Sequence, residues 1–580
     1  MILTVASLMA MYVSKHAAIG TPLIADGTFV LPLSQAWSLR PADSSLVTDA
    51  AEPGKVLHID FGDPPHGNVW DIELAQTTTT DLQAGETVYI QVDMKSSLRS
   101  TVGVVFQQAE SPNAKYMRNK VMLQPTWHRY RFAAIVNKNY AQKAAELSIF
   151  LGYGKGDVDI ANVLVQNMGI APIAGLHLPI NYFDGIPNGD GWKADALARI
   201  EKIRKGDLTV KVIDAVGNPV TGAKVSVEQL KHRFHFGTAV QSDVLVGKSK
   251  ADSEYRDTVT KLFNTVVFES EMKWVSLGAR NPGQIEASLD WLKKNDINVR
   301  GTNLIWGGWQ YLPTEMKTMS KSDCLALIHK RVTEAMAKYK GKVYVWDVVN
   351  EAVGQHALWD KIGYDAIPQV YQWAKEADPN VQLAYNDYAL TEELSYGPAY
   401  RGRVEDLLQQ IESAGGPVDV LGMESHQVVP MTPIWRVIEI LDELDKLNLN
   451  LEVTENDLSI WNDSVQAEYM GDYLTALFSH PSVQGFTIWG FWEKTQWRAK
   501  EGAAIINDDF SYRPAAAVWE NLVKHQWWTN VSGLTDSSGD YAARGFYGSY
   551  RVSVESGGVT TSEVIQLVPG PSQDVTITFK

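Results

Sequence analysis

The feature that most constrains the fold is an alternation of strand-like and helical segments between residues 234 and 525. Eight strand-like segments occur there, namely FHFGTAV, NTVVFES, NVRGTNLIW, VYVWDVVNE, QLAYNDY, VDVLGMESH, LNLEVTEND and GFTIWGF. Amphipathic stretches such as IEASLDWLKKND separate them, so the strands recur about every 30 to 45 residues. This repeat predicts an α/β fold, a (β/α)8 barrel with its active site where the strands end. A doubly wound open sheet is the alternative, but no glycine-rich phosphate loop follows any strand.

The segments on either side of 234–525 are predicted to be rich in strands. Residues 20–168 contain short apolar runs between Gly, Pro, Asn and Asp breaks, for example TVYIQVDM and AELSIFLGY, which is typical of a β-sandwich. Residues 169–192 are rich in Gly, Pro and Asn and are predicted to be a linker. We expect a helix and strands in 193–233 and strands in 526–580 to form a small sheet that flanks the barrel, because neither piece alone can bury a core.

Residues 1–19 allow two interpretations. Residues 2–13 are apolar and few enough for the core of a secretion signal, and small residues follow them. Lys15, however, comes after this core, whereas a secretion signal carries its positive charge before it. A cleaved leader and an ordinary N-terminal strand therefore both remain open.

Composition and charge exclude several classes of protein. The 580-residue chain carries 52 Lys and Arg against 68 Asp and Glu, a net charge of -16, which opposes binding to nucleic acid or to an anionic membrane. The single cysteine, Cys324, excludes an intrachain disulfide and cysteine-based zinc sites. The sequence contains no run of about 18 apolar residues, the length that would predict a membrane span. The 19 Trp and 23 Tyr residues offer flat rings that can stack on sugars, which makes carbohydrate a candidate ligand.

Two glutamates follow apolar strand segments. Glu351 ends the fourth segment, in WDVVNEA, and Glu455 ends the seventh, in VTEND. In a barrel both carboxyls point into the same mouth, where one can protonate a leaving oxygen while the other attacks or activates water, as glycoside hydrolysis requires. Taken singly, each glutamate could instead be a carboxylate held in an ion pair at the end of the barrel.

These two motifs and the order of the other segments resemble the family 10 glycoside hydrolases, the xylanase family with a (β/α)8 barrel. The resemblance covers 234–525 and includes HFGTAV, FNTVVFESEMKW, RGTNLIW, YNDY, SHQ and IWGFWEKTQW. It implies cleavage of β-1,4-xylan or a related β-linked plant polysaccharide by double displacement, with Glu351 as acid/base and Glu455 as nucleophile. The alternatives are a barrel of the same family retuned to a different β-glycan or β-glycoside, and a non-catalytic carbohydrate-binding protein.

The resemblance also implies roles for neighbouring side chains. Asn350 matches the asparagine that binds the 2-hydroxyl of the attacked sugar, and His426 matches the histidine that orients the nucleophile and keeps it ionised. Asp387 and Asn386 end the fifth strand segment and are expected to support these groups. The remaining candidates are expected to contact the substrate: Lys273, Trp274, Trp306, Trp489, Glu269 and Glu424. Core packing is the alternative for each tryptophan, and a solvated or ion-paired side chain is the alternative for Lys273.

Four positions depart from the family pattern on the donor side. Ser270, Thr302 and Gly307 stand where the family usually has an asparagine and two histidines, and Glu424 stands where it has a glutamine. Each lost hydrogen bond to a buried hydroxyl costs on the order of 1–3 kcal/mol. We therefore expect retained chemistry but weaker recognition of an unsubstituted xylose chain, unless Trp309 and Glu424 supply new contacts.

The predicted N-terminal sandwich resembles the carbohydrate-binding modules that are often fused to this family, around NVWDIELAQTTTTDLQAGETVYIQVDM. Candidates for sugar stacking there, with core packing as the alternative for each, are Trp70, Trp127, Tyr116 and Tyr153. A polysaccharide substrate implies a secreted or periplasmic enzyme.

Two histidines on one predicted strand, His232 and His235, raise the question of a metal site. No carboxylate lies beside them in the sequence, so we predict that both are structural. We expect no metal or other cofactor and no nucleic-acid partner, and the sequence leaves the oligomeric state open.

Overall fold

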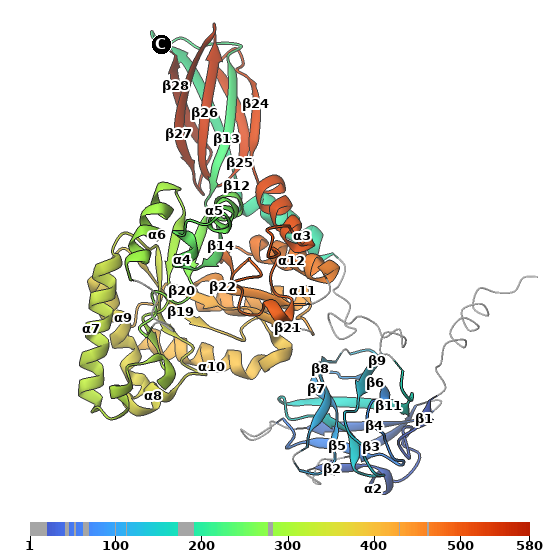
Figure 1. Cartoon of the computed structure of the whole chain (residues 1–580). Coiled ribbons are helices and arrows are strands. Elements are labelled where there is room, and N and C mark those ends of the chain that lie inside the picture. The colour runs from blue at the N-terminus through green and yellow to red at the C-terminus, as the bar shows by residue number, and fades with distance from the viewer. Residues whose placement is uncertain are drawn as a thin grey trace, which may run out of the picture. The chain divides into compact units, whose positions relative to one another are not determined.

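The computed structural model describes residues 20–40, 46–51, 54–61, 69–98, 100–111, 113–123, 125–171, 191–275, 282–428, 430–460 and 463–579. The segment 1–19 and most of the predicted linker, residues 172–190, lie outside these residues. The chain divides into two compact units, one made up mainly of residues 1–187 and the other mainly of residues 188–580. Figure 1 shows the elements of each unit.

The first unit is a β-sandwich, as predicted. One sheet has the order β3-β4-β11-β6-β9 with β1 paired to β11, and the other has the order β2-β5-β10-β7-β8. The bounds are β1 Thr21–Pro22, β2 Ser38–Arg40, β3 Leu46–Ala51, β4 Gly54–Phe61, β5 Glu73–Thr77, β6 Thr87–Lys95, β7 Thr101–Gln108, β8 Lys115–Met122, β9 His128–Ile135, β10 Ala145–Phe150 and β11 Gly156–Asn167. Val88, Ile90, Val92 and Met94 of β6 are all fully buried, because alternate side chains of a strand face the core.

The second unit contains the predicted barrel, which is confirmed. Its eight main strands are β14 His235–Val240, β15 Thr265–Phe268, β16 Asn298–Gly301, β18 Val345–Asn350, β19 Gln382–Asp387, β20 Val420–Met423, β22 Asn450–Ser459 and β23 Val483–Ile488. Each pairs in parallel with the next, and β23 pairs with β14, which closes the barrel. Two short strands, β17 (Ile305–Trp306) and β21 (His426–Val428), extend the wall at its carboxyl end.

Helices cover the outside of the barrel (Figure 1). The longer ones are α5 Lys250–Leu262, α6 Pro282–Lys294, α7 Lys321–Tyr339, α9 Ile367–Ala377, α10 Glu393–Ser413, α11 Ile434–Leu444 and α12 Asp463–Ser479, and shorter ones include α4 Ser242–Leu245, α8 Ala357–Ile362 and α13 Pro514–Glu520. Helix α11 buries Ile434, Val437, Leu441 and Leu444, which recur at helical spacing on one face. Among the described residues, no helix is both long and apolar enough to cross a membrane.

The strands on either side of the barrel associate, as predicted, but they form two facing sheets rather than one. One sheet has the order β25-β12-β28 and the other β24-β13-β26-β27. The bounds are β12 Lys205–Asp214, β13 Lys224–His232, β24 Asn530–Leu534, β25 Asp540–Phe546, β26 Gly548–Ser556, β27 Val559–Leu567 and β28 Gln573–Phe579, and α3, Trp192–Ile203, precedes β12. Val210 and Val212 pack with Val225 and Val552, because each sheet has one apolar face that must be covered.

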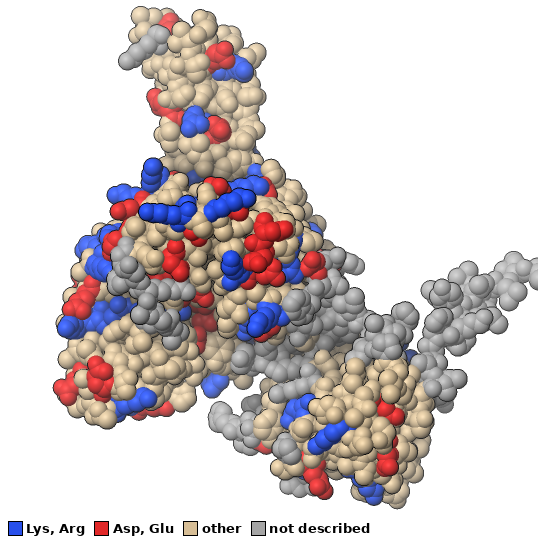
Figure 2. Space-filling model, viewed as in Figure 1, with Lys and Arg blue, Asp and Glu red and all other residues tan. Residues whose placement is uncertain are grey.

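Charged side chains of both signs are interspersed over the face of the barrel shown in Figure 2, rather than gathered by sign. The flanking sandwich carries fewer charges on the same face.

Candidate active site

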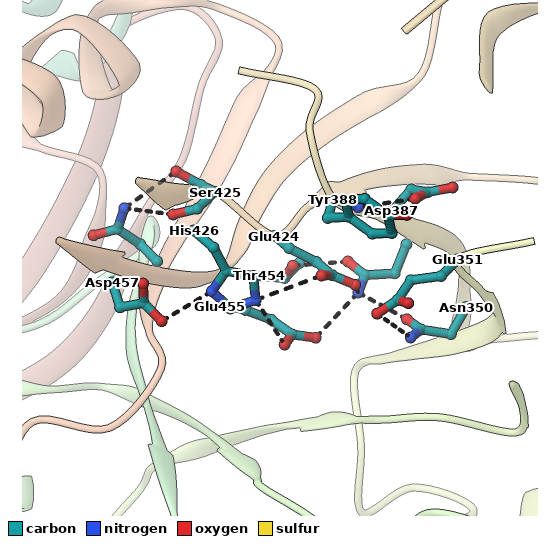
Figure 3. Close-up of polar contacts among 12 residues, drawn as sticks. Asn350, Glu351, Asp387, Tyr388, Glu424, Ser425, His426, Thr454, Glu455 and Asp457 are labelled. Atoms are coloured by element: carbon teal, nitrogen blue, oxygen red, sulfur yellow. Dashed lines mark hydrogen bonds and ion pairs between the residues drawn. The ribbon is translucent and has the colours of Figure 1, made fainter. Parts of the chain in front are cut away.

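The two predicted catalytic carboxyls lie in one cluster of polar side chains at the carboxyl end of the barrel, called the pocket below (Figure 3). Glu351 directly follows β18, and Glu455 lies on β22 between the residues that pair with β20 and those that pair with β21. Glu351 is 9% exposed and Glu455 is 8% exposed. Both carboxyls are therefore largely shielded from solvent, which strengthens the electrostatic coupling between them.

The backbone at Glu351 adopts a conformation that few residues other than glycine adopt. Its φ angle is 50°, in the left-handed region. The Glu351 amide donates to the carbonyl of Asn386 over 2.8 Å, and the Glu351 carbonyl accepts from the amide of Gln355 over 2.6 Å. These bonds hold the strained residue in place and direct its side chain into the pocket.

Burial, followed by the charge on Glu455, raises the pKa of Glu351 to about 7. The neighbouring Glu424 and Trp306 side chains act in the opposite direction and lower this pKa in part. A carboxyl with this pKa keeps its proton up to near neutral pH, which is what a general acid needs.

Asn386, at the end of β19, joins the polar groups of the pocket. Its amide nitrogen lies 2.9 Å from Asn350 Oδ1, 3.0 Å from Glu424 Oε1 and 3.2 Å from Glu455 Oε1. The hydroxyl of Thr454 donates to Asn386 Oδ1 over 2.7 Å and so fixes the orientation of this amide. The structure thus brings together residues from the fourth, fifth, sixth and seventh barrel strands.

His426 lies between the nucleophile candidate and a buried aspartate. Its Nε2 is 3.6 Å from Glu455 Oε2, and its Nδ1 is 2.9 Å from Asp457 Oδ2. Burial opposes ionisation of the imidazole, but Asp457 and the neighbouring carboxyls outweigh burial and raise the pKa of His426 well above its usual value. The resulting imidazolium stabilises an ionised Glu455.

Asp387 is fully buried and its oxygens are already bonded. The hydroxyls of Tyr385 and Tyr400 donate to it over 2.6 and 2.8 Å, and the amide of Tyr388 donates over 2.9 Å. Burial raises its pKa to about 7. Asp387 is therefore a buried, fully hydrogen-bonded group of the barrel wall and is not exposed to a substrate.

Three of the candidates for substrate binding lie close to one another. Lys273 Nζ lies 5.0 Å above the ring of Trp306 and 5.4 Å from the ring of Trp489. The Trp306 ring stacks on Tyr311 in a parallel arrangement. Trp274, which follows Lys273 in the sequence, is partly exposed. Glu269, also partly exposed, accepts a hydrogen bond from Gln241 over 2.8 Å.

One group of metal-ligand type lies together among the described residues. Ligand atoms of Glu424, His426 and Glu455 are all within 4.8 Å of one another. The raised pKa of His426 favours a proton on Nε2, and a protonated nitrogen cannot ligate a cation. The arrangement therefore favours two carboxyl groups beside an imidazolium over a bound cation.

A model of the family described as glycosyl hydrolase family 10 matches residues 226–521, half of the chain, including all of these groups. The chain belongs to glycosyl hydrolase family 10.

Three curated relatives of this family 10 chain illustrate the similarity. Anti-sigma-I factor RsgI6 of Acetivibrio thermocellus is 31% identical over 373 residues, which cover 63% of this chain and 47% of that protein. Endo-1,4-beta-xylanase 1 of Arabidopsis thaliana is 29% identical over 380 residues, 63% of this chain and 38% of that protein. Beta-1,4-xylanase of Dictyoglomus thermophilum is 29% identical over 308 residues, 46% of this chain and 83% of that protein. The chain thus spans less than half the length of the first two relatives.

The departures from the family 10 pattern have a structural basis at Gly307. A Cβ atom there would lie 2.3 Å from the backbone oxygen of Gln355 and 2.7 Å from Trp359 Nε1. The loop after Glu351 and the α8 tryptophan therefore occupy the space that a histidine side chain would need. Thr302 is also fully buried, so it does not present a hydroxyl at an open surface.

Two charged residues that the sequence analysis did not single out, Asp457 and Arg498, lie beside this family 10 site. Asp457 accepts from the Trp497 indole over 2.8 Å and contacts Arg498 at 3.3 Å, besides His426. Asp457 is two residues after Glu455 on a strand, so the alternation of side chains was a signal that both face the same side.

A buried ionic cluster lies inside the family 10 barrel below the pocket. Arg300, 1% exposed, forms ion pairs with Asp347 on β18 and Glu452 on β22. The hydroxyl of Tyr344 donates to Glu452 over 3.1 Å. Three charged residues within apolar strands were the signal in the sequence that a buried ionic cluster exists. Which of them pair depends on closure of the barrel.

The two histidines near the base of the barrel make local contacts. The ring N–H of His232 donates to the carbonyl of Trp527, and the His235 ring stacks on Tyr344 with centroids 4.0 Å apart. Burial lowers the pKa of each to about 3. These contacts fit the structural interpretation of both residues.

The aromatic candidates of the N-terminal sandwich differ in exposure. Trp70 is 46% exposed and Trp127 is 42% exposed, with lysine ammonium groups 5.7 and 5.2 Å from their ring centroids. Tyr116 packs edge-on against Tyr140, and Tyr153 lies over Gly103 of β7. The two tryptophans are therefore the more accessible rings.

Proposed function

We propose that this chain is a retaining glycoside hydrolase that cleaves β-1,4-xylan or a related β-linked plant polysaccharide by double displacement. The observation that carries the proposal is the pairing of Glu351, whose pKa is raised to about 7, with Glu455, which faces an imidazolium. One carboxyl is thereby held as an acid and the other as an anion within a single pocket.

In the first step the Glu455 carboxylate attacks the anomeric carbon while Glu351 gives its proton to the leaving oxygen. Asn350, next to Glu351 and fixed by Asn386, is in position to bond the 2-hydroxyl of the attacked sugar. In the second step the Glu351 carboxylate takes a proton from water, and the water oxygen displaces Glu455 from the anomeric carbon. Both carboxyls then return to their starting protonation states.

Trapping and product stereochemistry test the mechanism. An activated 2-deoxy-2-fluoro-β-xylobioside is expected to label Glu455, and NMR of fresh xylo-oligosaccharide products is expected to show the β-anomer first. Glu455→Ala should lower kcat by at least about a hundredfold. Glu351→Ala should retain much more activity on an aryl glycoside with a good leaving group than on an unactivated oligosaccharide. Initial formation of the α-anomer would contradict retention.

The natural polymer is tested by a panel of plant and algal polysaccharides with product chromatography. Xylan is the first candidate because relatives are named xylanases. A different β-glycan is the alternative, because Thr302 and Gly307 remove two donor-side histidines of the family pattern. Turnover of an aryl β-glucoside in preference to an aryl β-xylobioside would favour that alternative.

Non-catalytic carbohydrate binding is the second candidate function. One relative is named an anti-sigma factor, which is a regulatory name. The presence of Glu351, Glu455, Asn350 and His426 in one pocket favours catalysis over this alternative. Binding of oligosaccharides without any turnover by the wild-type protein would favour it instead.

We further propose that the N-terminal sandwich binds carbohydrate and that the enzyme is secreted or periplasmic. On the five-stranded sheet, Glu146 and Ser148 alternate with core residues and so lie on the face away from the core. Gln107 donates to Glu146 over 2.9 Å on that face, and its own buried oxygen has no hydrogen-bond partner among the described residues. A polar ligand would satisfy that oxygen.

Pull-down with insoluble xylan tests the proposed role of this sandwich. In the full-length protein, Trp70→Ala and Gln107→Ala are each expected to weaken binding to the polymer and leave turnover of soluble oligosaccharides intact. Leu31→Ala, at a comparably exposed apolar residue of the same unit, is the control. Equal retention of all variants on the polymer would contradict the proposal.

A further inference from the structure

A third carboxyl, Glu424, lies between the two catalytic carboxyls (Figure 3). It directly follows β20 and is 2% exposed. Its Oε1 accepts from Asn386 over 3.0 Å, its Oε2 lies 3.5 Å from His426 Nε2, and the charge of Glu351 acts on it. The family pattern has a glutamine at this position, so the pocket contains an ionisable group where a neutral amide is usual.

The charge of the pocket limits how many of these carboxyls can be ionised. The titratable groups that face Glu424, or lie one contact further away, are Glu351, Glu455, His426, Asp387 and Asp457. The imidazolium of His426 is already shared with Asp457 at 2.9 Å. Three ionised carboxylates beside one shared cation would leave uncompensated charge in a buried site, which is strongly unfavourable.

Catalysis assigns the charge of two of the three groups. Glu455 has to be an anion to attack the anomeric carbon, and Glu351 has to be protonated to assist departure of the leaving group. The proton state of Glu424 is the remaining variable.

We propose that Glu424 is a neutral carboxylic acid in the working enzyme and a positioning residue for Glu351, to which its O–H donates a hydrogen bond. The inference rests on the proposed function, because it assigns Glu351 the acid/base role. A carboxylic acid carries one O–H donor and one carbonyl acceptor, so it reproduces the donor and acceptor of a glutamine amide. Its Oε1 accepts from Asn386, and its Oε2, which lies 3.5 Å from His426 Nε2, carries the O–H that is directed to Glu351.

This hydrogen bond changes in strength during the reaction. While Glu351 is protonated, the Glu424 O–H donates to a neutral carbonyl oxygen. Once Glu351 has given its proton to the leaving oxygen, the same O–H donates to a carboxylate, and such charge-assisted bonds are about twice as strong. Glu424 therefore favours proton transfer and steadies Glu351 as the base of the second step. Burial, and then the charges of Glu351 and Glu455, raise the pKa of Glu424 well above its usual value, which supports a neutral state.

Two substitutions separate the neutral from the ionised form. Glu424→Gln keeps a neutral donor and acceptor, and we expect it to lower kcat/KM by less than about tenfold, because one hydrogen bond is weakened rather than lost. The alkaline limb of its pH profile should stay at the wild-type pH. Glu424→Ala removes the donor, and we expect a loss of about fivefold to a hundredfold on an unactivated xylo-oligosaccharide. The loss should be smaller on an aryl glycoside with a good leaving group, because that substrate needs little help from Glu351.

Two outcomes would overturn the inference. If Glu424→Gln moved the alkaline limb to lower pH by about one unit or more, an anion beside Glu351 would have been removed, and Glu424 would be ionised in the working enzyme. If Glu424→Ala lost equal activity on both substrates, its role would be structural packing and not support of the acid.

A measurement that needs no turnover separates failure of this inference from failure of the proposed function. Carbon NMR of the full-length protein with labelled glutamate side chains is expected to show a carboxyl that remains protonated at neutral pH and is absent from Glu424→Gln. Glu392→Gln, at another buried glutamate, is the control and should remove a different resonance. A Glu424 resonance that titrates at its ordinary pKa would refute the inference even if the enzyme proved inactive on every glycoside.

Discussion

The charge on the nucleophile should control the proton affinity of the acid, and covalent trapping of Glu455 tests this directly. The pKa of Glu351 is raised to about 7 by burial first and by the charge on Glu455 second. Formation of a glycosyl ester neutralises Glu455. An ionised Glu351 then has one anionic neighbour fewer, so the pKa of Glu351 should fall in the intermediate.

The size of this fall follows from the geometry of a retaining site. Carboxyls about 5.5 Å apart interact by about 3 kcal/mol at an effective dielectric constant of about 20, which corresponds to about 2 pKa units. Burial persists in the intermediate, and the His426 imidazolium screens part of the charge on Glu455. We therefore expect the pKa of Glu351 to fall from about 7 by between about one and two units.

Two pH profiles measure the two values. The alkaline limb of kcat/KM reports Glu351 as the acid of the free enzyme and should lie near pH 7. The acidic limb for reactivation of the 2-fluoroglycosyl enzyme reports Glu351 as the base and should lie about one to two units lower. Limbs that coincide would refute the coupling between the two carboxyls. Asp387→Asn tests the assignment, because the pKa of Asp387 is also raised to about 7. This variant should retain an alkaline limb, and loss of that limb would identify Asp387 as the acid.

Three further perturbations test the surroundings of the site. Arg300→Met leaves two buried carboxylates without their cation and should lower the free energy of unfolding by about 3–5 kcal/mol in urea titrations. Tyr344→Phe removes one hydrogen bond and should lower the free energy of unfolding by about 0.5–1.5 kcal/mol. Equal losses for these two variants would contradict the ionic role. Gly307→His should destabilise the protein by about 1–3 kcal/mol, because a Cβ atom there would lie 2.3 Å from a backbone oxygen. The same variant should lower kcat/KM on xylo-oligosaccharides, and a gain in activity would contradict this prediction. Asp457→Asn should lower the pKa of His426 in an NMR titration, because the carboxylate that favours the imidazolium is removed, and an unchanged titration would refute the assignment.

The order of apolar strands and amphipathic helices in the sequence was enough to predict the barrel and the face on which its candidate site lies. Alternating strand and helix patterns allow few topologies, and a parallel barrel brings the ends of all its strands to one face. Glu351 and Glu455 could be placed at that face because each follows a run of apolar residues. The roles of these two residues remain predictions, since they rest on resemblance and on pocket geometry.

Only the tertiary structure decided what surrounds each of those residues. Arg300 pairs with Glu452, which is 152 positions away, and no local pattern encodes that pairing. The two-sheet sandwich likewise depends on tertiary structure, because the barrel brings β12 and β13, which precede it, next to the C-terminal strands, which follow it. The pKa of Glu351 also depends on tertiary structure, because burial and the charges of residues on other strands shift it. This burial and these charges surround Glu351 only once the barrel has closed.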